Sequence, residues 1–172
     1  MAGVVVLSVV LVVAGVAIHL ACLRGLLRVL PWLKGLGHLS VGVMVAGALV
    51  GHMVEIGLFG TAIARLEATG RHGTLSGAVG AEVTWADCYY YSAVTYTSLG
   101  FGDLTPTGSL RLLAAVEVLT GVALIAWTAS FLFLVMQKSW GPAVHEALAR
   151  HQGTGAPARA RPGPRSRDEA GS

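Results

Sequence analysis

Two glycines separated by one residue, Gly100 and Gly102, occupy a segment in which the backbone itself could do chemistry. Glycine adopts left-handed backbone conformations at little steric cost, and alternate residues in unusual conformations can aim successive carbonyl oxygens at a common axis. Such oxygens can replace the hydration shell of a cation. Taken alone, Gly-Phe-Gly is also typical of a tight turn near a membrane surface, so the surrounding elements decide between the two interpretations.

A short helix is predicted immediately before these glycines. Thr84 can cap its N-terminus, and Asp87, three residues later, suits the positive end of the helix dipole. The helix would run to about Thr97, too short to cross a bilayer, and Gly100 and Gly102 would then stop it. Irregular backbone at membrane depth is tolerated only inside protein or beside water. The segment is therefore expected to be a re-entrant loop that lines an aqueous path.

Three apolar runs are long enough to hold this loop in a membrane. The chain of 172 residues is 54% hydrophobic and only 12% charged, which excludes an ordinary soluble domain. Runs at residues 1–23, 39–64 and 112–137 each approach or exceed the length of about 20 residues that a spanning helix needs. The first run has no Lys or Arg ahead of it and exceeds a signal-peptide core, so a retained helix is expected.

The sequence TYTSLGFGDLTP, Thr95–Pro106, resembles the pore signature of the potassium-channel family, T-x-T-T-V-G-Y-G-D-x-x-P. The resemblance extends over residues 84–139, with the second apolar run as the family's outer helix. It implies an all-α membrane protein with three transmembrane helices, a re-entrant pore helix and a selectivity filter. One chain carries one such loop and supplies one carbonyl per ring, so a homotetramer is implied.

The resemblance also assigns the site. Potassium is the permeant ion and not a cofactor. It would bind the carbonyl oxygens of Ser98, Leu99, Gly100 and Phe101, and the Ser98 hydroxyl would add a ligand. No cofactor is expected. The ion-binding residues are Ser98, Leu99, Gly100, Phe101 and Gly102, supported by Thr95, Thr97 and Asp103.

Several positions depart from the family pattern. Ser98 replaces Thr, Leu99 replaces Val, and Phe101 replaces a Tyr whose hydroxyl braces the filter with a bond worth about 1 kcal/mol. Val94 stands where many members carry a Glu that partners the acid corresponding to Asp103. A weakly selective cation channel is therefore an alternative to a potassium-selective one. A non-conducting membrane subunit that partners or senses, using the extra first helix, is a second alternative.

The expected organisation is one pore domain, residues 39–138, with additions at both ends. From residue 139 onward the chain is rich in Gly, Ala, Pro and Arg, so we expect a mostly disordered tail apart from a helical extension over 143–150. The expected ranges are 1–29 for the extra transmembrane helix, 30–38 for a cytoplasmic loop, 39–64 for the outer helix, 65–83 for the outer loop, 84–97 for the pore helix, 97–103 for the filter, 109–138 for the inner helix and 139–172 for the cytoplasmic tail.

Orientation follows from the basic residues, which accumulate on the cytoplasmic side of a membrane. Nine of them follow the first or third apolar run, against Arg65, Arg71 and Arg111 on the other side. We expect a multi-pass cell-membrane protein with its N-terminus outside and its C-terminus cytoplasmic. Cys22 and Cys88 would then lie on opposite sides and cannot pair.

The same distribution limits the partners. Topology and lipid headgroups account for the basic residues, so membrane lipid and the chain itself are the expected partners, with no nucleic acid. The sequence has no nucleophile–base pair, nucleotide-binding loop or set of metal ligands. An enzyme with a small-molecule substrate is therefore not expected.

Four other residues are candidates for gating or modulation. Gly121, in the third run, is either a gating hinge or a site of close helix packing. Glu117, one turn earlier, either acts on the filter and the ions or makes a structural bond to the pore helix. His52 and Glu55 share one helix face and favour a hydrogen-bonded pair, with pH sensing, a proton relay or a metal site as alternatives; His19 lies separately in the first helix.

Overall fold

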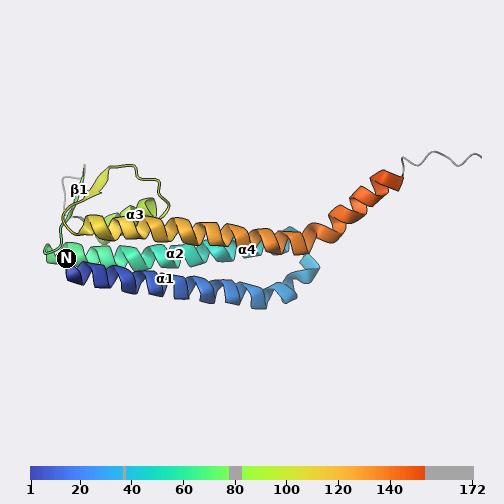
Figure 1. Cartoon of the computed structure of the whole chain (residues 1–172), viewed down its shortest axis with the longest axis horizontal. Coiled ribbons are helices and arrows are strands. Elements are labelled where there is room, and N and C mark those ends of the chain that lie inside the picture. The colour runs from blue at the N-terminus through green and yellow to red at the C-terminus, as the bar shows by residue number, and fades with distance from the viewer. Residues whose placement is uncertain (37, 78–82, 154–172) are drawn as a thin grey trace, which may run out of the picture. The chain divides into compact units, whose positions relative to one another are not determined.

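The computed structural model describes residues 1–36, 38–77 and 83–153, and these are mostly helical (Figure 1). The chain divides into two compact units, Met1–Ser139 and Trp140–Ser172. The elements are α1 (Ala2–Val29), the 3-10 helix η1 (Leu30–Leu36), α2 (His38–Thr69), β1 (Leu75–Gly77), α3 (Trp85–Tyr96), β2 (Leu104–Pro106) and α4 (Leu110–Gly153).

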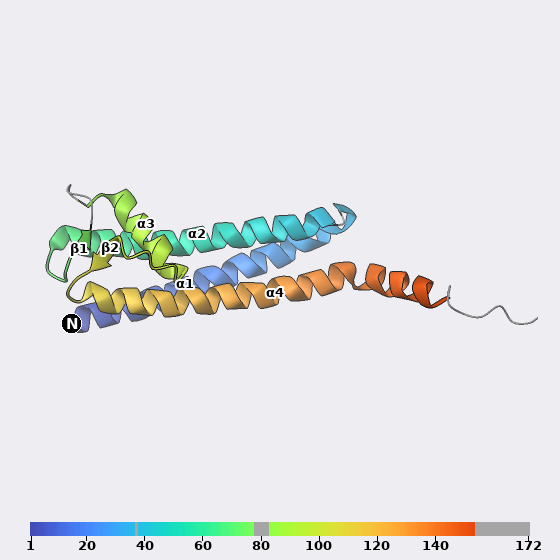
Figure 2. The same ribbon diagram turned by 90° about the horizontal axis from the view of Figure 1, so that it is seen from above.

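Among the described residues, three helices are long and apolar enough to cross a membrane, within the segments Ala2–Leu33, Leu39–Thr69 and Leu110–Lys138. In both views α1, α2 and the first part of α4 run alongside one another, and η1 connects the far ends of α1 and α2 (Figures 1 and 2). The short helix α3 and the two strands gather at the end where α1 begins. The predicted class, three spanning helices with a short extra helix, is confirmed.

The first helix packs against α2 through one narrow stripe. Buried residues recur about every four positions, which is the spacing of a single helical face. Valines on the other faces stay exposed, as expected of a surface that meets lipid. The buried set is Val4, Ser8, Leu11, Gly15, His19 and Leu23, and the exposed valines are Val5, Val6, Val9, Val10 and Val13.

Two glycines one turn apart on α2 allow α1 to approach closely. A Cβ atom on Gly47 would lie 2.4 Å from Leu26 Cδ2, and one on Gly51 would lie 2.7 Å from Cys22 Sγ. Small residues at this spacing are common where membrane helices touch. Cys22 thereby packs against α2, and both it and Cys88 are free thiols.

The outer helix is longer than its apolar run. It continues to Thr69 instead of ending at residue 64, because the apolar run marks the reach of the hydrocarbon layer and not the end of the hydrogen-bonded helix. Glu67, in the additional turn, accepts a hydrogen bond of 2.7 Å from the backbone amide of Leu75. The extra turn thus holds the start of β1.

Residues 65–83 were predicted to be an outer loop. The structure adds a short strand within this range. Strand β1 pairs antiparallel with β2, with Leu75 opposite Pro106 and Gly77 opposite Leu104. Each strand has three residues, too few for an alternating pattern to reveal it in the sequence. Because β2 directly follows the filter segment, this pairing ties the outer end of that segment to the loop.

The first part of the tail, predicted to be mostly disordered from residue 139 onward, is helical. Helix α4 runs on to Gly153 and includes the expected extension over 143–150. The prediction for residues 154–172 lies outside the described part of the chain. The other helix ends fall within one or two residues of their predicted positions, which is the ordinary uncertainty of helix boundaries.

The core of the first unit lies at the α3 end of the helices. It joins residues of α1, α2, α3, α4 and both strands, so that the elements on either side of the loop after α3 share one core. Its buried members are Val4, Leu11, Phe59, Ile63, Leu75, Cys88, Tyr91, Leu104, Leu110, Leu113 and Ala114.

Candidate functional site

Helix α3 begins with the capping box that the sequence predicted. The Thr84 hydroxyl accepts a hydrogen bond from the Asp87 amide at 3.2 Å, and the Asp87 carboxylate accepts one from the Thr84 amide at 2.8 Å. Hydrogen bonds from Thr84 lower the pKa of the Asp87 carboxyl, because they favour its charged form. The start of the short helix is therefore fixed, and with it the place where the helix ends.

The backbone after α3 alternates in handedness. Ser98 and Gly100 both have φ of 57°, and Gly102 has φ of 79°. The two glycines adopt the left-handed conformations predicted for them. Ser98 was not expected to join them, and it is the one non-glycine residue with positive φ in the described part of the chain.

Three consecutive amides of this segment point back at the end of α3. The amide of Ser98 donates to the Thr95 carbonyl at 2.9 Å, and those of Leu99 and Gly100 donate to the Val94 carbonyl at 2.9 and 3.3 Å. In a trans peptide the carbonyl points opposite to the amide of the next residue. The carbonyl oxygens of Ser98 and Leu99 therefore point away from α3, as an ion-binding row requires.

The two predicted support threonines hold the end of α3. Thr97 is the C-terminal cap, and its hydroxyl donates to the Ala93 carbonyl at 2.7 Å. Thr95 is buried. Both residues therefore belong to the end of α3, and their support of the ion-binding segment stays a prediction.

The filter segment is open to solvent in the single chain. The side chains of Leu99 and Phe101 are 58% and 64% exposed, which is unusual for large apolar groups in a loop held so firmly. Behind the segment lies a cavity of about 290 Å³, lined by α3, the filter and the start of α4, including Tyr91, Ser98 and Ala115. Exposed apolar groups of this size mark a surface that contacts protein or membrane.

Asp103, at the outer end of the segment, has a partner that sequence reasoning missed. The hydroxyl of Tyr90 in α3 donates to Asp103 Oδ2 at 2.8 Å. This bond joins Asp103, beyond the predicted ion-binding residues, to α3. The pattern that the sequence resembles uses a Glu at the position of Val94 and a Tyr hydroxyl at the position of Phe101 for such contacts, and this chain has neither. The sequence did contain a sign of this contact. The three consecutive tyrosines Tyr89–Tyr91 point in different directions around the helix, so one of them could reach Asp103.

The Tyr90–Asp103 bond predicts a titration. The hydrogen bond to the carboxylate raises the pKa of Tyr90 above its usual value near 10, because ionisation would break the bond and place two negative charges together. Asp103→Asn is expected to lower that pKa toward the ordinary value. Tyrosinate absorbance against pH measures it, and subtraction of the titration of Tyr90→Phe isolates this hydroxyl. An unchanged Tyr90 titration in Asp103→Asn would contradict the contact.

The region from α2 to the membrane part of α4 matches a known protein family. A family model described as an ion channel covers residues 41–138, more than half of the chain. The chain belongs to this ion channel family. Its domain is the two-transmembrane one typical of potassium channels, and it includes α3 and the filter segment. No curated protein and no solved structure gives a significant match to the chain.

The family match bears on the other expectations. Together with the three apolar helices, it indicates a multi-pass membrane protein. It also indicates a role in ion transport, while the expectation that the protein is not an enzyme stays a prediction. The first helix lies outside the matched residues and is an addition to the family domain.

Gly121 of the channel lies where α4 meets the end of the pore helix. A Cβ atom on Gly121 would lie 2.1 Å from the carbonyl oxygen of Tyr96 and 2.8 Å from its carbonyl carbon. Backbone atoms are therefore in contact with each other at this point. The close-packing interpretation has direct support, while the gating hinge stays a prediction.

Glu117 reaches the pore helix but not the filter. It is fully buried, and its Oε1 lies 2.5 Å from the hydroxyl oxygen of Ser92, which itself donates to the Ile56 carbonyl at 2.8 Å. Its other oxygen has no hydrogen-bond partner among the described residues. The structural interpretation is thus supported, with Ser92 rather than a tyrosine or a backbone amide as partner.

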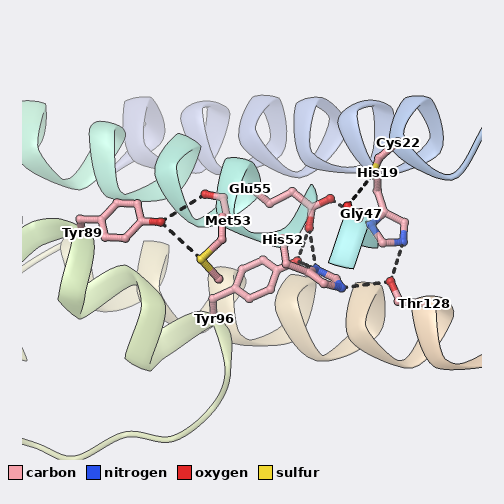
Figure 3. A network of polar contacts seen from close by, with 9 residues as sticks. All are labelled: His19, Cys22, Gly47, His52, Met53, Glu55, Tyr89, Tyr96 and Thr128. Carbon is pink, nitrogen blue, oxygen red and sulfur yellow. Dashed lines mark hydrogen bonds and ion pairs between the residues drawn. The ribbon is translucent and has the colours of Figure 1, made fainter. Parts of the chain in front are cut away.

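His52 and Glu55 of α2 have polar contacts with one residue from each of α1, α3 and α4 (Figure 3). Glu55 Oε1 lies 2.9 Å from His19 Nδ1 of α1, and Oε2 lies 3.0 Å from His52 Nδ1 and accepts from the Tyr96 hydroxyl of α3. The Thr128 hydroxyl of α4 lies 3.0 Å from His52 Nε2 and 3.4 Å from His19 Nε2. The predicted pair is therefore one part of a larger network.

Proposed function

We propose that four copies of this chain assemble around one axis into a passive, potassium-selective channel. Ions would cross by binding the backbone carbonyls of Ser98, Leu99, Gly100 and Phe101, with Gly102 completing the filter. The handedness of residues 98, 100 and 102, combined with three amides turned back to α3, is the observation that carries this proposal. It leaves carbonyl oxygens free on the side away from the protein, and carbonyl rings are how potassium filters replace hydration water.

The tetramer is proposed because one chain cannot complete such a site. A single strand supplies one carbonyl at each level, whereas a dehydrated cation needs oxygens all around it. The exposed Leu99 and Phe101 side chains support the same arrangement, since neighbouring chains would cover them. The channel would thereby acquire a filter buried on every side except the ion path.

Membrane orientation is also part of the proposal. The start of α1 lies at the same end as the two strands and the outer end of the filter (Figure 2). The excess of Lys and Arg after α1 and after the membrane part of α4 favours a cytoplasmic position for the opposite end. The N-terminus would then be outside and the C-terminus cytoplasmic.

The decisive test is ion flux from liposomes that contain the purified channel. We expect flux down a potassium gradient, block by barium, and much weaker flux down a sodium gradient. Gly100→Ala should abolish potassium flux, because a side chain at φ of 57° costs about 1–2 kcal/mol in each of four chains. Gly42→Ala is the matched control, since Gly42 lies within α2 with no neighbouring atom within 4 Å of an added Cβ.

Each result discriminates between the candidate functions. Equal potassium and sodium fluxes would favour the weakly selective channel, for which the absent hydroxyl at Phe101 is the specific reason. No flux from a tetramer of proven stoichiometry, at any gradient, would favour the non-conducting subunit. Flux that Gly100→Ala leaves unchanged would place the ion path elsewhere.

A further inference from the structure

Three side chains capable of binding a metal converge where helices α1 and α2 pack together. His19, His52 and Glu55 each offer a ligand atom, and these atoms lie within 4.8 Å of one another. All three side chains are buried (Figure 3). The sequence showed only His52 and Glu55 as neighbours, because nothing in it fixes which face of α1 turns toward α2.

The buried carboxylate of Glu55 needs positively charged partners. Glu55 is fully buried, and in the described ranges only the two imidazoles form ion-pair contacts with its carboxylate. A carboxylate away from water is costly unless it is paired or coordinates a metal. Two imidazoles and one carboxylate form a donor set that suits first-row transition metals, whereas magnesium and calcium prefer oxygen alone.

The surroundings already match the outer layer of a metal site. A histidine that binds metal through one nitrogen usually donates its other N–H to a nearby acceptor. Both Nε2 atoms meet the same acceptor, the Thr128 hydroxyl, at 3.0 and 3.4 Å, which leaves both Nδ1 atoms facing Glu55. The carboxylate is in turn held by the Tyr96 hydroxyl.

The ligand atoms already lie near the separations of a metal site. Bonds of about 2.0–2.1 Å in a tetrahedral zinc site place ligand atoms about 3.3 Å apart. The two nitrogen–oxygen distances between Glu55 and the imidazoles are 2.9 and 3.0 Å. The two contacts use different oxygens of Glu55, and the three ligand atoms all lie within 4.8 Å of one another, so side-chain rotations that bring both imidazole nitrogens toward one oxygen would admit the ion.

We propose that His19, His52 and Glu55 bind a divalent transition-metal ion, with Zn²⁺ the best match. The site would join α1 to α2 directly and, through Thr128 and Tyr96, would reach α4 and the end of the pore helix. The first helix, which lies outside the family domain, would then serve to close a metal site next to the pore helix. This proposal does not depend on the ion that the channel conducts.

Binding can be measured directly on the full-length channel, purified without a polyhistidine tag and stripped with a chelator. Equilibrium dialysis against Zn²⁺, followed by elemental analysis, should give one ion per chain. His19→Gln and His52→Gln should each abolish this stoichiometric binding. His72→Gln is the matched control, because His72 lies in the outer loop and should leave binding unchanged.

A second variant covers the case in which the histidine variants do not fold. Thr128→Val keeps all three ligands but removes the acceptor shared by both Nε2 atoms, and it should weaken Zn²⁺ binding by about 10- to 100-fold. Substitution of Co²⁺ in the wild-type channel should give the intense visible bands of a tetrahedral site. Absence of bound Zn²⁺ in the wild-type channel, or equal binding by folded His19→Gln and wild type, would overturn the proposal.

Discussion

Replacing Glu55 by leucine is expected to reduce the free energy of unfolding of the channel by about 3–5 kcal/mol. The carboxylate has contacts with His19, His52 and Tyr96, so its removal takes a shared partner from polar groups on three helices and leaves the Tyr96 hydroxyl with only the His52 Nδ1 atom, 3.0 Å away. The hydrogen bonds of the cluster are not replaced by water, because the side chains around it are buried.

Thermal unfolding in detergent, followed by loss of helical circular dichroism, measures this effect in the metal-free protein. Glu55→Gln is the matched control, since the amide keeps the shape of the side chain and one acceptor oxygen. Its loss of stability should be clearly smaller. A Glu55→Leu protein as stable as the wild type would show that the cluster contributes little, and the first helix would then be held by apolar packing and by Gly47 and Gly51 alone.

The fold was largely predictable because membrane helices are recognised by their length and hydropathy. The left-handed backbone at Gly100 and Gly102 was predictable for a different reason, because glycine adopts this conformation at little steric cost. Both kinds of information are local. The capping box at Thr84 and the positions of Gly100 and Gly102 were therefore within reach of the sequence, whereas the ends of α2 and α4 were not.

What escaped prediction depends on how helices rotate against each other. The contact of His19 with Glu55 joins residues 36 positions apart, and that of Tyr90 with Asp103 depends on the path of the loop after α3. Neither has a periodic signal, and each polar residue had several possible neighbours. The β1–β2 pairing was missed because three-residue strands carry too little pattern.

Gly121→Ala is expected to destabilise the channel by about 3 kcal/mol and to remove potassium flux. The added Cβ would lie 2.1 Å from the Tyr96 carbonyl oxygen, and backbone atoms cannot rotate aside as a flexible side chain can. Helix α4 would have to move away from the end of α3, the same end that holds the amides of the filter segment in place. The effect should therefore reach the filter and not only the inner helix.

This substitution also separates the two interpretations of Gly121. If the glycine were needed only as a hinge, alanine would change gating while thermal stability stayed equal to or above that of the wild type, because alanine favours helix over glycine by about 1 kcal/mol. If close packing is its role, stability and flux should fall together. Gly42→Ala, a helical glycine with open space, should show only the propensity gain. Unfolding temperature and flux measured on these two variants decide which property of Gly121 the channel uses, since close packing and bending make opposite demands on the same position.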